Sequence, residues 1–200
     1  LGLYSVKSEM EDIWLRFKEP EAYNEITAKI NRNITDKDKQ INEFILPIED
    51  ALKKSGFNFE IKKRVKTPYS IWNKMNTKGI TFDQIYDLYA VRIIFDSEIG
   101  RAETERDSCY HIFSIITGLY RYKADRVRDW VNYPKNNGYE ALHCTLMSNS
   151  GIWIEVQIRS RRMNEIAEKG IAAHWSYKKD GFAESNENEL DKWLIKVKAL

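Results

Sequence analysis

The stretch Arg64–Lys74, which reads RVKTPYSIWNK, decides the fold because it joins a strand pattern directly to a helix pattern. Arg64 and Lys66 close the alternating run FNFEIKKRVK, and residues two apart in a strand share one face of its sheet. Thr67 is a typical helix N-cap, and Pro68 suits the first position of a helix. The stretch therefore predicts a strand that passes into a helix with almost no loop.

The same stretch predicts where an anion could bind. Ser70 and Lys74 are four residues apart, so they share one face of the predicted helix. Because Arg64 and Lys66 arrive from the strand, cations and a hydroxyl from two elements would converge near a helix N-terminus, which favours a polyphosphate. The alternative interpretation is a basic edge that is simply solvated.

Outward from this stretch, helix and strand patterns follow one another. Apolar residues from Tyr23 to Leu52 recur at helical spacing, and Pro47 is expected to kink or restart that helix. A buried strand is predicted at AVRIIFD, which contains Arg92, and two more strands at ALHCTLM and IWIEVQI, which SNSG would join. One face of IWIEVQI would be core, and the other, which alternates from Trp153 to Arg159, would be a charged working surface or face solvent. An amphipathic helix is predicted around residues 109–119. These patterns favour helices around a mixed sheet of about five strands, in an α/β or α+β architecture.

The composition narrows the class of protein. The chain has 200 residues, a net charge of +2 and 42% hydrophobic residues, which excludes a disordered or fibrous protein. The charge is also too balanced for a global nucleic-acid-binding field. Cys109 and Cys144 match no metal-binding spacing, so we expect buried, reduced thiols in a cytoplasmic protein.

Two carboxylates lie beside or within predicted strands. Asp87 comes just before the AVRIIFD strand, and Glu155 lies on the polar face of IWIEVQI, between Trp153 and Gln157. If these strands are neighbours, the two carboxylates could hold Mg²⁺, which favours one or two carboxylates together with substrate phosphates. The alternative is that each carboxylate pairs with a nearby arginine.

The segment YPKNNGYEALH places Lys135, Asn137, Tyr139 and His143 around a turn. In an extended chain Tyr139 and His143 face the same side, and the small Ala141 between them would leave space for a flat ligand such as a nucleobase. The alternative is a loop tyrosine with a structural histidine.

A second basic patch lies upstream, where Arg126 and Arg128 alternate along RVRDWV. Two cationic patches, an aromatic platform and two carboxylates suggest two nucleotides that meet over a metal and transfer a phosphate-containing group. P-loop and Rossmann motifs are absent from the sequence. His111 and His174 are more typical of packing or capping residues than of metal ligands.

The segments described so far resemble one known family. The synthetase domain of the long RelA/SpoT homologues, which makes the alarmone (p)ppGpp, is similar to this chain over residues 57–178, in the segments RVKTPYSIWNKM, DLYAVRIIF, RVRDWVNYPKNNGYEALH, IEVQIRS and AEKGIAAHW. The resemblance implies a nucleotidyltransferase-like fold, a mixed sheet flanked by helices. It also implies transfer of the β,γ-pyrophosphate of ATP to the ribose 3′-hydroxyl of GDP or GTP, with release of AMP, in the stringent response.

The resemblance further implies a role for each candidate residue. ATP would bind Arg64, Lys66, Ser70, Lys74 and Arg92, with the adenine between the two arginines. GDP or GTP would bind Arg128, Lys135, Asn137, Tyr139, His143 and Gln157, with the guanine stacked on the tyrosine. Asp87 and Glu155 would hold Mg²⁺, and Glu155 would also activate the 3′-hydroxyl.

The ends of the chain resemble connections to other domains. Residues 1–20 are similar to the helix that leaves the family's hydrolase domain, but the metal-binding motif of that hydrolase is absent from the sequence. We therefore expect a piece of a longer protein without hydrolase activity. It would comprise a linker helix over 1–20, a synthetase domain over 21–178, and a polar loop with a C-terminal helix over 179–200 that leads to regulatory domains. Any contact with the ribosome or RNA would come through such further domains.

Two other classes of function remain open on the sequence alone. A nucleotide-binding regulator could keep the fold without turnover, although a pure binder would not need both Asp87 and Glu155. An RNA-binding module could use the basic patches and exposed aromatic residues, although the nearly neutral charge disfavours it.

Overall fold

Five strands form one mixed sheet in the computed structural model, which describes residues 4–32, 34–97 and 102–169. In spatial order the strands are β1 (Phe59–Val65), β2 (Tyr89–Phe95), β5 (Trp153–Ser160), β4 (Leu142–Met147) and β3 (Arg128–Asp129). β2 and β5 run parallel, whereas the other neighbouring pairs are antiparallel. The predicted α+β class and the mixed five-stranded sheet are confirmed.

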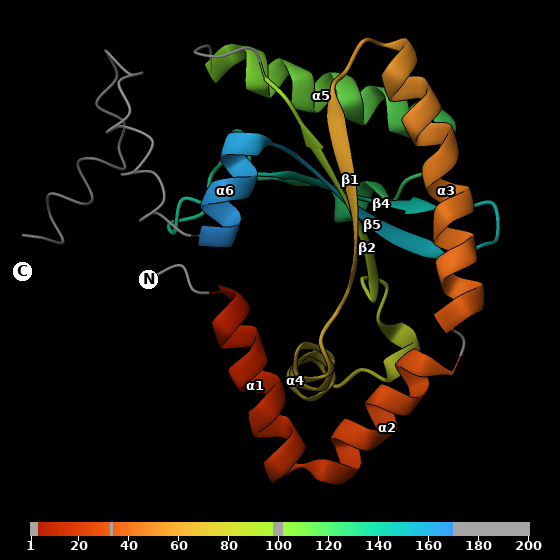
Figure 1. Ribbon diagram of the computed structural model, residues 1–200, viewed down its shortest axis with the longest axis vertical. Coiled ribbons are helices and arrows are strands. Elements are labelled where there is room, and N and C mark those ends of the chain that lie inside the picture. Colours follow the sequence, from red (N-terminus) through yellow and green to blue (C-terminus); the bar gives the residue numbers. More distant parts are fainter. Residues whose placement is uncertain (1–3, 33, 98–101, 170–200) are drawn as a thin grey trace, which may run out of the picture.

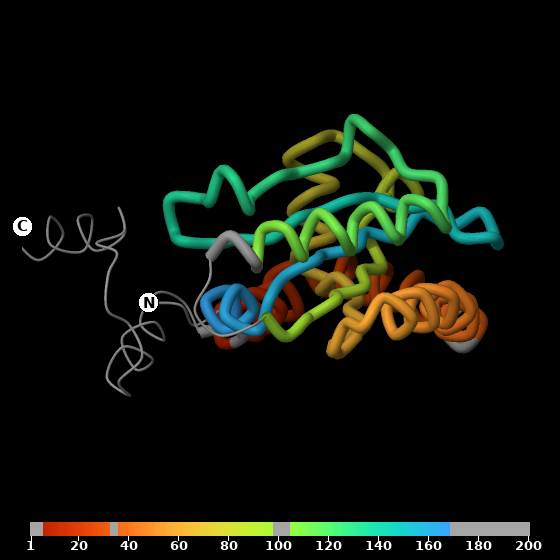
Figure 2. Tube along the Cα trace, turned by 90° about the horizontal axis from the view of Figure 1, so that it is seen from above, coloured from red at the N-terminus to blue at the C-terminus, as the bar shows by residue number. Residues whose placement is uncertain are grey.

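The described residues also form six α-helices around this sheet. They are α1 (Tyr4–Lys18), α2 (Pro20–Asn31), α3 (Ile34–Lys54), α4 (Pro68–Lys78), α5 (Ala102–Leu119) and α6 (Arg161–Lys169). Two short 3₁₀ turns, η1 (Phe82–Gln84) and η2 (Ala124–Arg126), lie before β2 and β3. In the view of Figure 2, α5 (green) lies between α3 (orange) and the connection from α5 to β4 (green to teal).

The main hydrophobic core lies between one face of the sheet and the helices α3 and α5, which Figure 1 shows beside the strands. Ile48 of α3 and Ile112 of α5 are fully buried with Val91 and Val156 of the two central strands. Burial of such side chains stabilises the fold by about 1.5–3 kcal/mol each. Cys109 and Cys144 are unpaired and fully buried, as predicted. The opposite face of the sheet is therefore left for polar side chains.

A second, smaller core joins α1, α2 and α4 at the end of the molecule drawn lowest in Figure 1. Ile26 of α2 and Ile71 of α4 are buried there. The Trp14 ring of α1 packs on the rings of Tyr69 and Trp72 of α4. These contacts hold α4 firmly at the end of β1.

The junction between β1 and α4 forms as the sequence predicts. Thr67 is the N-cap, and its Oγ1 accepts a hydrogen bond from the backbone N–H of Ser70 at 3.3 Å. Pro68 occupies the first helical turn, and Gly79 ends the helix in a left-handed conformation with φ of 61°. Only Lys66 and Thr67 separate strand from helix, so both elements are fixed relative to each other.

Of the two outcomes expected at Pro47, a kink or a restart of the helix, the restart does not occur. Pro47 lies inside α3, which runs without a break from Ile34 to Lys54. The interruption comes earlier, between α2 and α3. Phe44 and Ile48 pack into the sheet on both sides of the proline, and this burial offsets its cost of about 3 kcal/mol in a helix interior.

Some expectations fall outside the part of the chain that the structure describes. These are the role of His174 and the predicted loop and C-terminal helix over 179–200. Within residues 4–32, 34–97 and 102–169, no helix is both long and apolar enough to cross a bilayer.

Candidate functional site

The predicted strand residues share the polar face of the sheet. Cross-strand pairs place one row of side chains across four strands: Arg92, Gln157, His143 and Arg128. In the next row, Arg64 and Glu155 flank the small Ala90. Residues that pair directly across strands project to the same side. The candidate donor and acceptor residues of all these strands therefore meet on the face opposite α3 and α5.

Asp87 joins the two lysines of the predicted phosphate cradle. Lys66 Nζ lies 3.2 Å from Asp87 Oδ2, and Lys74 Nζ lies 2.5 Å from Asp87 Oδ1. Burial alone would raise the pKa of Asp87, but the hydrogen bonds and charges of the lysines outweigh burial and lower it. The carboxylate is thus ionised at neutral pH and fixes both ammonium groups at the N-terminal end of β2.

Ser70 completes this group from the first turn of α4. Its Oγ accepts a hydrogen bond from Thr67 Oγ1 at 3.0 Å, which places the hydroxyl beside the N-terminus of the helix. Arg64, on the neighbouring strand, is exposed. The two lysines thus meet at Asp87, and Ser70 shares one face of α4 with Lys74, four residues further along the helix.

Arg92 lies diagonally across from Arg64 on the same face, with Ala90 beside it. Such diagonal neighbours are about 7–8 Å apart, which leaves room for a flat group between two guanidinium planes. Arg92 Nη1 donates to Glu168 Oε1 of α6 at 2.7 Å, and the side chain is only 13% exposed. Its buried Nε has no hydrogen-bond partner among the described residues.

Glu155 lies at the centre of the polar face. Its Oε1 accepts a hydrogen bond from Gln157 Nε2 at 2.7 Å and lies 3.4 Å from His143 Nδ1. Burial alone would raise the pKa of Glu155, but His143 and Gln157 outweigh burial, so the pKa is lowered. The charge of Asp87 acts on the same carboxyl in the raising direction, which places both carboxylates within electrostatic reach of each other.

His143 links Glu155 to Tyr139. Tyr139 Oη lies 2.7 Å from His143 Nε2, opposite the ring nitrogen that faces Glu155. Burial is the largest effect on His143 and lowers its pKa, so the ring is neutral near pH 7. In a neutral imidazole one nitrogen donates and the other accepts. The ring can therefore donate to the carboxylate while it accepts from the tyrosine.

The expected space between Tyr139 and His143 is not present. Their rings are nearly perpendicular, at 76°, and are joined directly by the hydrogen bond. Trp130 packs edge-on against both rings, and Lys135 Nζ lies 3.9 Å from the Trp130 ring centroid. Because Ala141 is fully buried, it opens no slot for a flat ligand. Stacking of a base on Tyr139 would have to use a face of its ring outside this contact.

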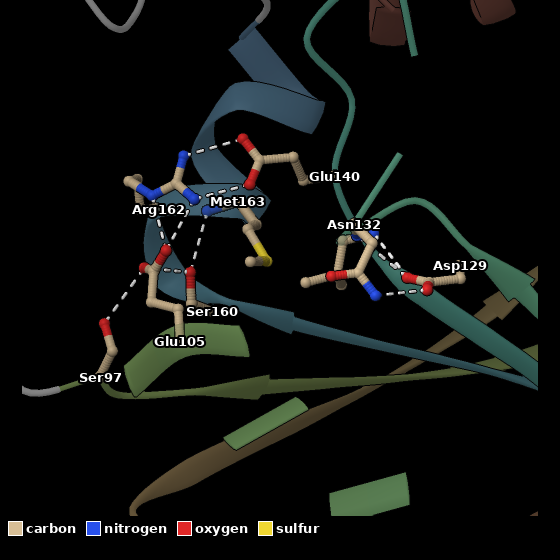
Figure 3. Close-up of polar contacts among 9 residues, drawn as sticks. Ser97, Glu105, Asp129, Asn132, Glu140, Ser160, Arg162 and Met163 are labelled. Carbon is tan, nitrogen blue, oxygen red and sulfur yellow. Dashed lines mark hydrogen bonds and ion pairs between the residues drawn. The ribbon is translucent and has the colours of Figure 1, made fainter. Parts of the chain in front are cut away.

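Two polar clusters hold the segment that carries these residues. In Figure 3, Arg162 of α6 lies between two carboxylates, with a bidentate contact to Glu140 at 2.7 and 3.0 Å and a contact to Glu105 of α5 at 2.8 Å. At the other end of the segment, Asp129 accepts from the backbone N–H and the side chain of Asn132. Tyr110 Oη of α5 also donates to Asp129 at 2.6 Å. Residues 129–140 are thus tied at both ends to the helices.

The remaining candidates of this segment lie at its surface. Arg128 Nη1 donates to the backbone carbonyls of Asp125 and Val127, both at 2.9 Å. Asn137 Oδ1 accepts from the backbone N–H of Tyr139 at 3.3 Å. Both candidates are exposed, so they remain accessible to a ligand.

Sequence reasoning missed Arg159. The polar face of β5 was expected to carry a charged working surface or to face solvent, yet Arg159 is 1% exposed. It donates to Gln157 and Tyr139. Its alternation with Glu155 and Gln157 along the strand was the available signal, but alternation does not reveal what covers a face. Trp130 and Arg162 were also missed, because their contacts come from segments distant in sequence.

The carboxylates have the donor chemistry of a magnesium site. Among the described residues, no group of three or more His, Cys, Asp or Glu side chains is arranged to hold a metal ion. Asp87 and Glu155 would therefore supply only part of a coordination shell. This fits Mg²⁺, which commonly takes one or two carboxylates and completes its shell with phosphate oxygens and water.

The chain is similar to known proteins over most of its length. A family model described as "Region found in RelA / SpoT proteins" matches residues 63–181, more than half of the chain. A protein of Photobacterium angustum named GTP pyrophosphokinase is 35% identical over 202 residues, covering 100% of this chain and 26% of the relative. An Aquifex aeolicus protein named guanosine-3′,5′-bis(diphosphate) 3′-pyrophosphohydrolase is 35% identical over 179 residues, covering 89% of this chain and 25% of the relative. The chain thus spans about a quarter of the length of these curated relatives.

Among solved structures, the small alarmone synthetase 2 of Bacillus subtilis is 22% identical, with a TM-score of 0.49 over 81% of this chain and 92% of that chain.

Proposed function

The chain belongs to the RelA/SpoT family, and from this premise we propose that it is the part of such a protein that synthesises (p)ppGpp in the cytoplasm. The reaction transfers the β,γ-pyrophosphate of ATP to the ribose 3′-hydroxyl of GDP or GTP and releases AMP. Relatives named GTP pyrophosphokinase, which match nearly the whole chain, support this assignment.

One observation carries the proposal. The ionised carboxylate of Glu155 lies between a cationic cluster and an aromatic cluster on one face of the sheet. On one side Asp87 holds two lysines suited to phosphates, and on the other Tyr139 and His143 offer a ring and hydrogen-bonding groups. A site for two different nucleotides needs such a division, because the phosphates of the donor take part in the transfer and require cations, whereas the acceptor must be held by its base.

The residues of the cationic side would bind ATP. Lys66, Ser70 and Lys74 would contact its phosphates, while Arg64 and Arg92 would stack on its adenine. When phosphates approach, they compete with Asp87 for the two ammonium groups, so the carboxylate becomes available as a ligand. Mg²⁺ held by Asp87 and Glu155 would neutralise the negative charge that develops on the phosphates during transfer.

The residues of the aromatic side would bind the acceptor. Tyr139 would stack on guanine, with Arg128, Lys135, Asn137, His143 and Gln157 around the nucleotide. In the transfer, the 3′-oxygen forms a bond to the β-phosphorus of ATP while the bond from that phosphorus to the oxygen of the leaving AMP breaks. Glu155 takes the proton of the 3′-hydroxyl as general base, a task for which its ionised state suits it.

A product assay tests the proposal. The chain is incubated with ATP labelled in its γ-phosphate, Mg²⁺ and GDP or GTP, and the products are separated by chromatography. Equal amounts of AMP and a labelled guanosine carrying a 3′-pyrophosphate are expected. Binding of both nucleotides without products would instead identify a catalytically silent regulatory domain. Labelled inorganic phosphate with ADP, in place of AMP, would contradict pyrophosphate transfer.

A further inference from the structure

Arg159 is a buried cation on the polar face of β5, beside the proposed acceptor residues. Its side chain is among the largest that are fully buried, at 1% exposure. None of the ion pairs among residues 4–32, 34–97 and 102–169 includes it, and its Nε has no hydrogen-bond partner there. Burial lowers the pKa of Arg159 to about 10; the charge of Arg92 acts in the same direction, whereas Tyr139 and Glu168 act against it. A buried charge that makes no direct ion pair is costly, so its contacts need an explanation other than stability.

The contacts of Arg159 are all made as a donor. Its Nη2 donates to Gln157 Oε1 at 2.6 Å and to Tyr139 Oη at 3.0 Å. Its guanidinium carbon also lies 5.3 Å from the centroid of the Tyr139 ring. A guanidinium has five N–H donors and no acceptor. Gln157 and Tyr139 must therefore each accept the hydrogen bond from Arg159 through an oxygen lone pair.

This constraint fixes the direction of the hydrogen bonds beyond Arg159. Because Gln157 turns its carbonyl oxygen to Arg159, its NH₂ group faces Glu155 and donates to Oε1. Because Tyr139 Oη accepts from Arg159, its own proton is directed to His143 Nε2, 2.7 Å away. The neutral His143 then carries its proton on Nδ1, the nitrogen that faces Glu155.

Both chains of hydrogen bonds, one through Gln157 and one through Tyr139 and His143, end at Oε1 of Glu155. A carboxylate that accepts two hydrogen bonds is held in its ionised form. If Arg159 were replaced by a group that can also accept, the amide could turn around and the histidine could change tautomer. Glu155 would then face lone pairs in place of N–H groups.

We propose, resting on the function proposed above, that Arg159 is a positioning residue that sets the donor direction of the Tyr139, His143 and Gln157 network and so keeps Glu155 a hydrogen-bonded base. It acts through these three residues and does not itself touch the reacting atoms. Its buried charge is retained because a donor-only group is required at this position.

Three variants test the proposal. Arg159→Gln replaces the donor-only group with one that can both donate and accept, whereas Arg159→Lys keeps a group that can only donate. Arg161→Gln is the matched control, because Arg161 is the next arginine along the chain, two residues after Arg159, is 55% exposed, and pairs with Asp96 at the surface. The tautomer of His143 is read from ¹⁵N chemical shifts at pH 8 in the nucleotide-free chain.

The wild-type, Arg159→Lys and Arg161→Gln proteins are expected to show His143 protonated on Nδ1. Arg159→Gln should show a mixture of tautomers. An unchanged tautomer in Arg159→Gln, or the same mixture in Arg159→Lys, would overturn the proposal. If Arg159→Gln does not fold, the tautomer of the Arg159→Lys variant decides alone, because a donor-only group must preserve it.

Kinetics supply the second readout. In Arg159→Gln we expect the KM for GDP to rise about tenfold, which corresponds to about 1.4 kcal/mol, with the KM for ATP changed less than about twofold. Parallel increases in both KM values would contradict the proposal. If the wild-type chain makes no product, the function proposed above fails, while the tautomer measurement still tests Arg159.

Discussion

The two halves of the polar face are built in different ways. The donor half is the cationic side around Asp87, proposed to bind ATP, and the acceptor half is the aromatic side around Tyr139 and His143, proposed to bind GDP or GTP. The donor half depends on ion pairs among partly exposed side chains, with Lys66 and Lys74 each at least 19% exposed around Asp87. The acceptor half depends on hydrogen bonds among buried and half-buried side chains, and His143 is 8% exposed. A charged cluster near solvent can exchange one anion for another with little rearrangement. A buried hydrogen-bond network is instead set in one geometry before any ligand arrives.

The halves also differ in how the chain assembles them. Lys66 and Lys74 lie eight residues apart, one in the two-residue connection that follows β1 and the other on α4. Tyr139, His143 and Arg159 come from a loop and two strands, and Trp130 and Arg162 support them from further segments. The donor half is therefore a local structure, whereas the acceptor half exists only after the sheet has formed.

Glu155→Gln should have the largest effect, because this residue lies where the two halves meet. Loss of a general base reduces kcat by about 10²–10⁴-fold, and binding of each nucleotide should change little. Product formation under saturating substrates and calorimetric titration of ATP measure the two quantities. Glu165→Gln, an exposed position on α6, is the control. Activity within tenfold of wild type would remove Glu155 from the base role.

Lys74→Met tests the donor half alone. Loss of a charged contact to phosphate should raise the KM for ATP by about 10–100-fold, while the KM for GDP stays within about twofold. Initial rates with one nucleotide varied at a time give both constants. Lys78→Met, in the exposed last turn of the same helix, is the control and should behave as wild type. Equal increases for both nucleotides would show that the halves are not separate.

Tyr139→Ala is the corresponding test of the acceptor half. Loss of base stacking, which contributes about 1–3 kcal/mol, should raise the KM for GDP by about 5–100-fold and leave ATP nearly unaffected. Tyr133→Ala is the control, because Tyr133 lies in the same segment and is 76% exposed. A larger effect on ATP than on GDP would reverse the assignment of the two halves.

The smallest expected effect is on the way the free energy of unfolding changes with pH. It arises from His143, in the buried acceptor half. The pKa of His143 is lowered below the ordinary value of 6.5, so the unfolded chain binds this proton more readily than the folded protein does. Its contribution to stability is therefore complete above about pH 6.5 and is lost as the pH falls below that value. Thermal unfolding between pH 8 and 5 should show this decline, and His143→Asn should flatten it. An identical decline in the variant would assign the effect to other groups.

Much of the fold could be predicted because its signals are local. The cap at Thr67, the stop at Gly79 and the alternation along β5 each depend on neighbouring residues. The helix does not restart at Pro47 for the opposite reason, since packing against the sheet on both sides of the proline overrides a local rule. The short β3 strand was also not expected, because two residues carry no periodicity.

The site, too, could be predicted where its signals are local and could not where they come from distant segments. Spacing alone indicated that Lys66, Ser70 and Lys74 would meet, and the structure brings them together at the start of α4. Spacing indicated that Tyr139 and His143 would share a side, but it predicted a space where there is a hydrogen bond. Whether two rings touch depends on what packs behind them, here Trp130 and Arg159, and no pattern within the segment contains that information.

The helix α6 reaches both halves of the face. Arg162 in its first turn holds Glu140, next to Tyr139, and Glu168 near its end holds Arg92 of the donor half. The two residues are six positions apart, about 9 Å along a single rigid rod. A shift or rotation of α6 therefore moves its contacts with Arg92 and with Glu140 together. Neither half of the polar face can be displaced through α6 without a matching displacement of the other half.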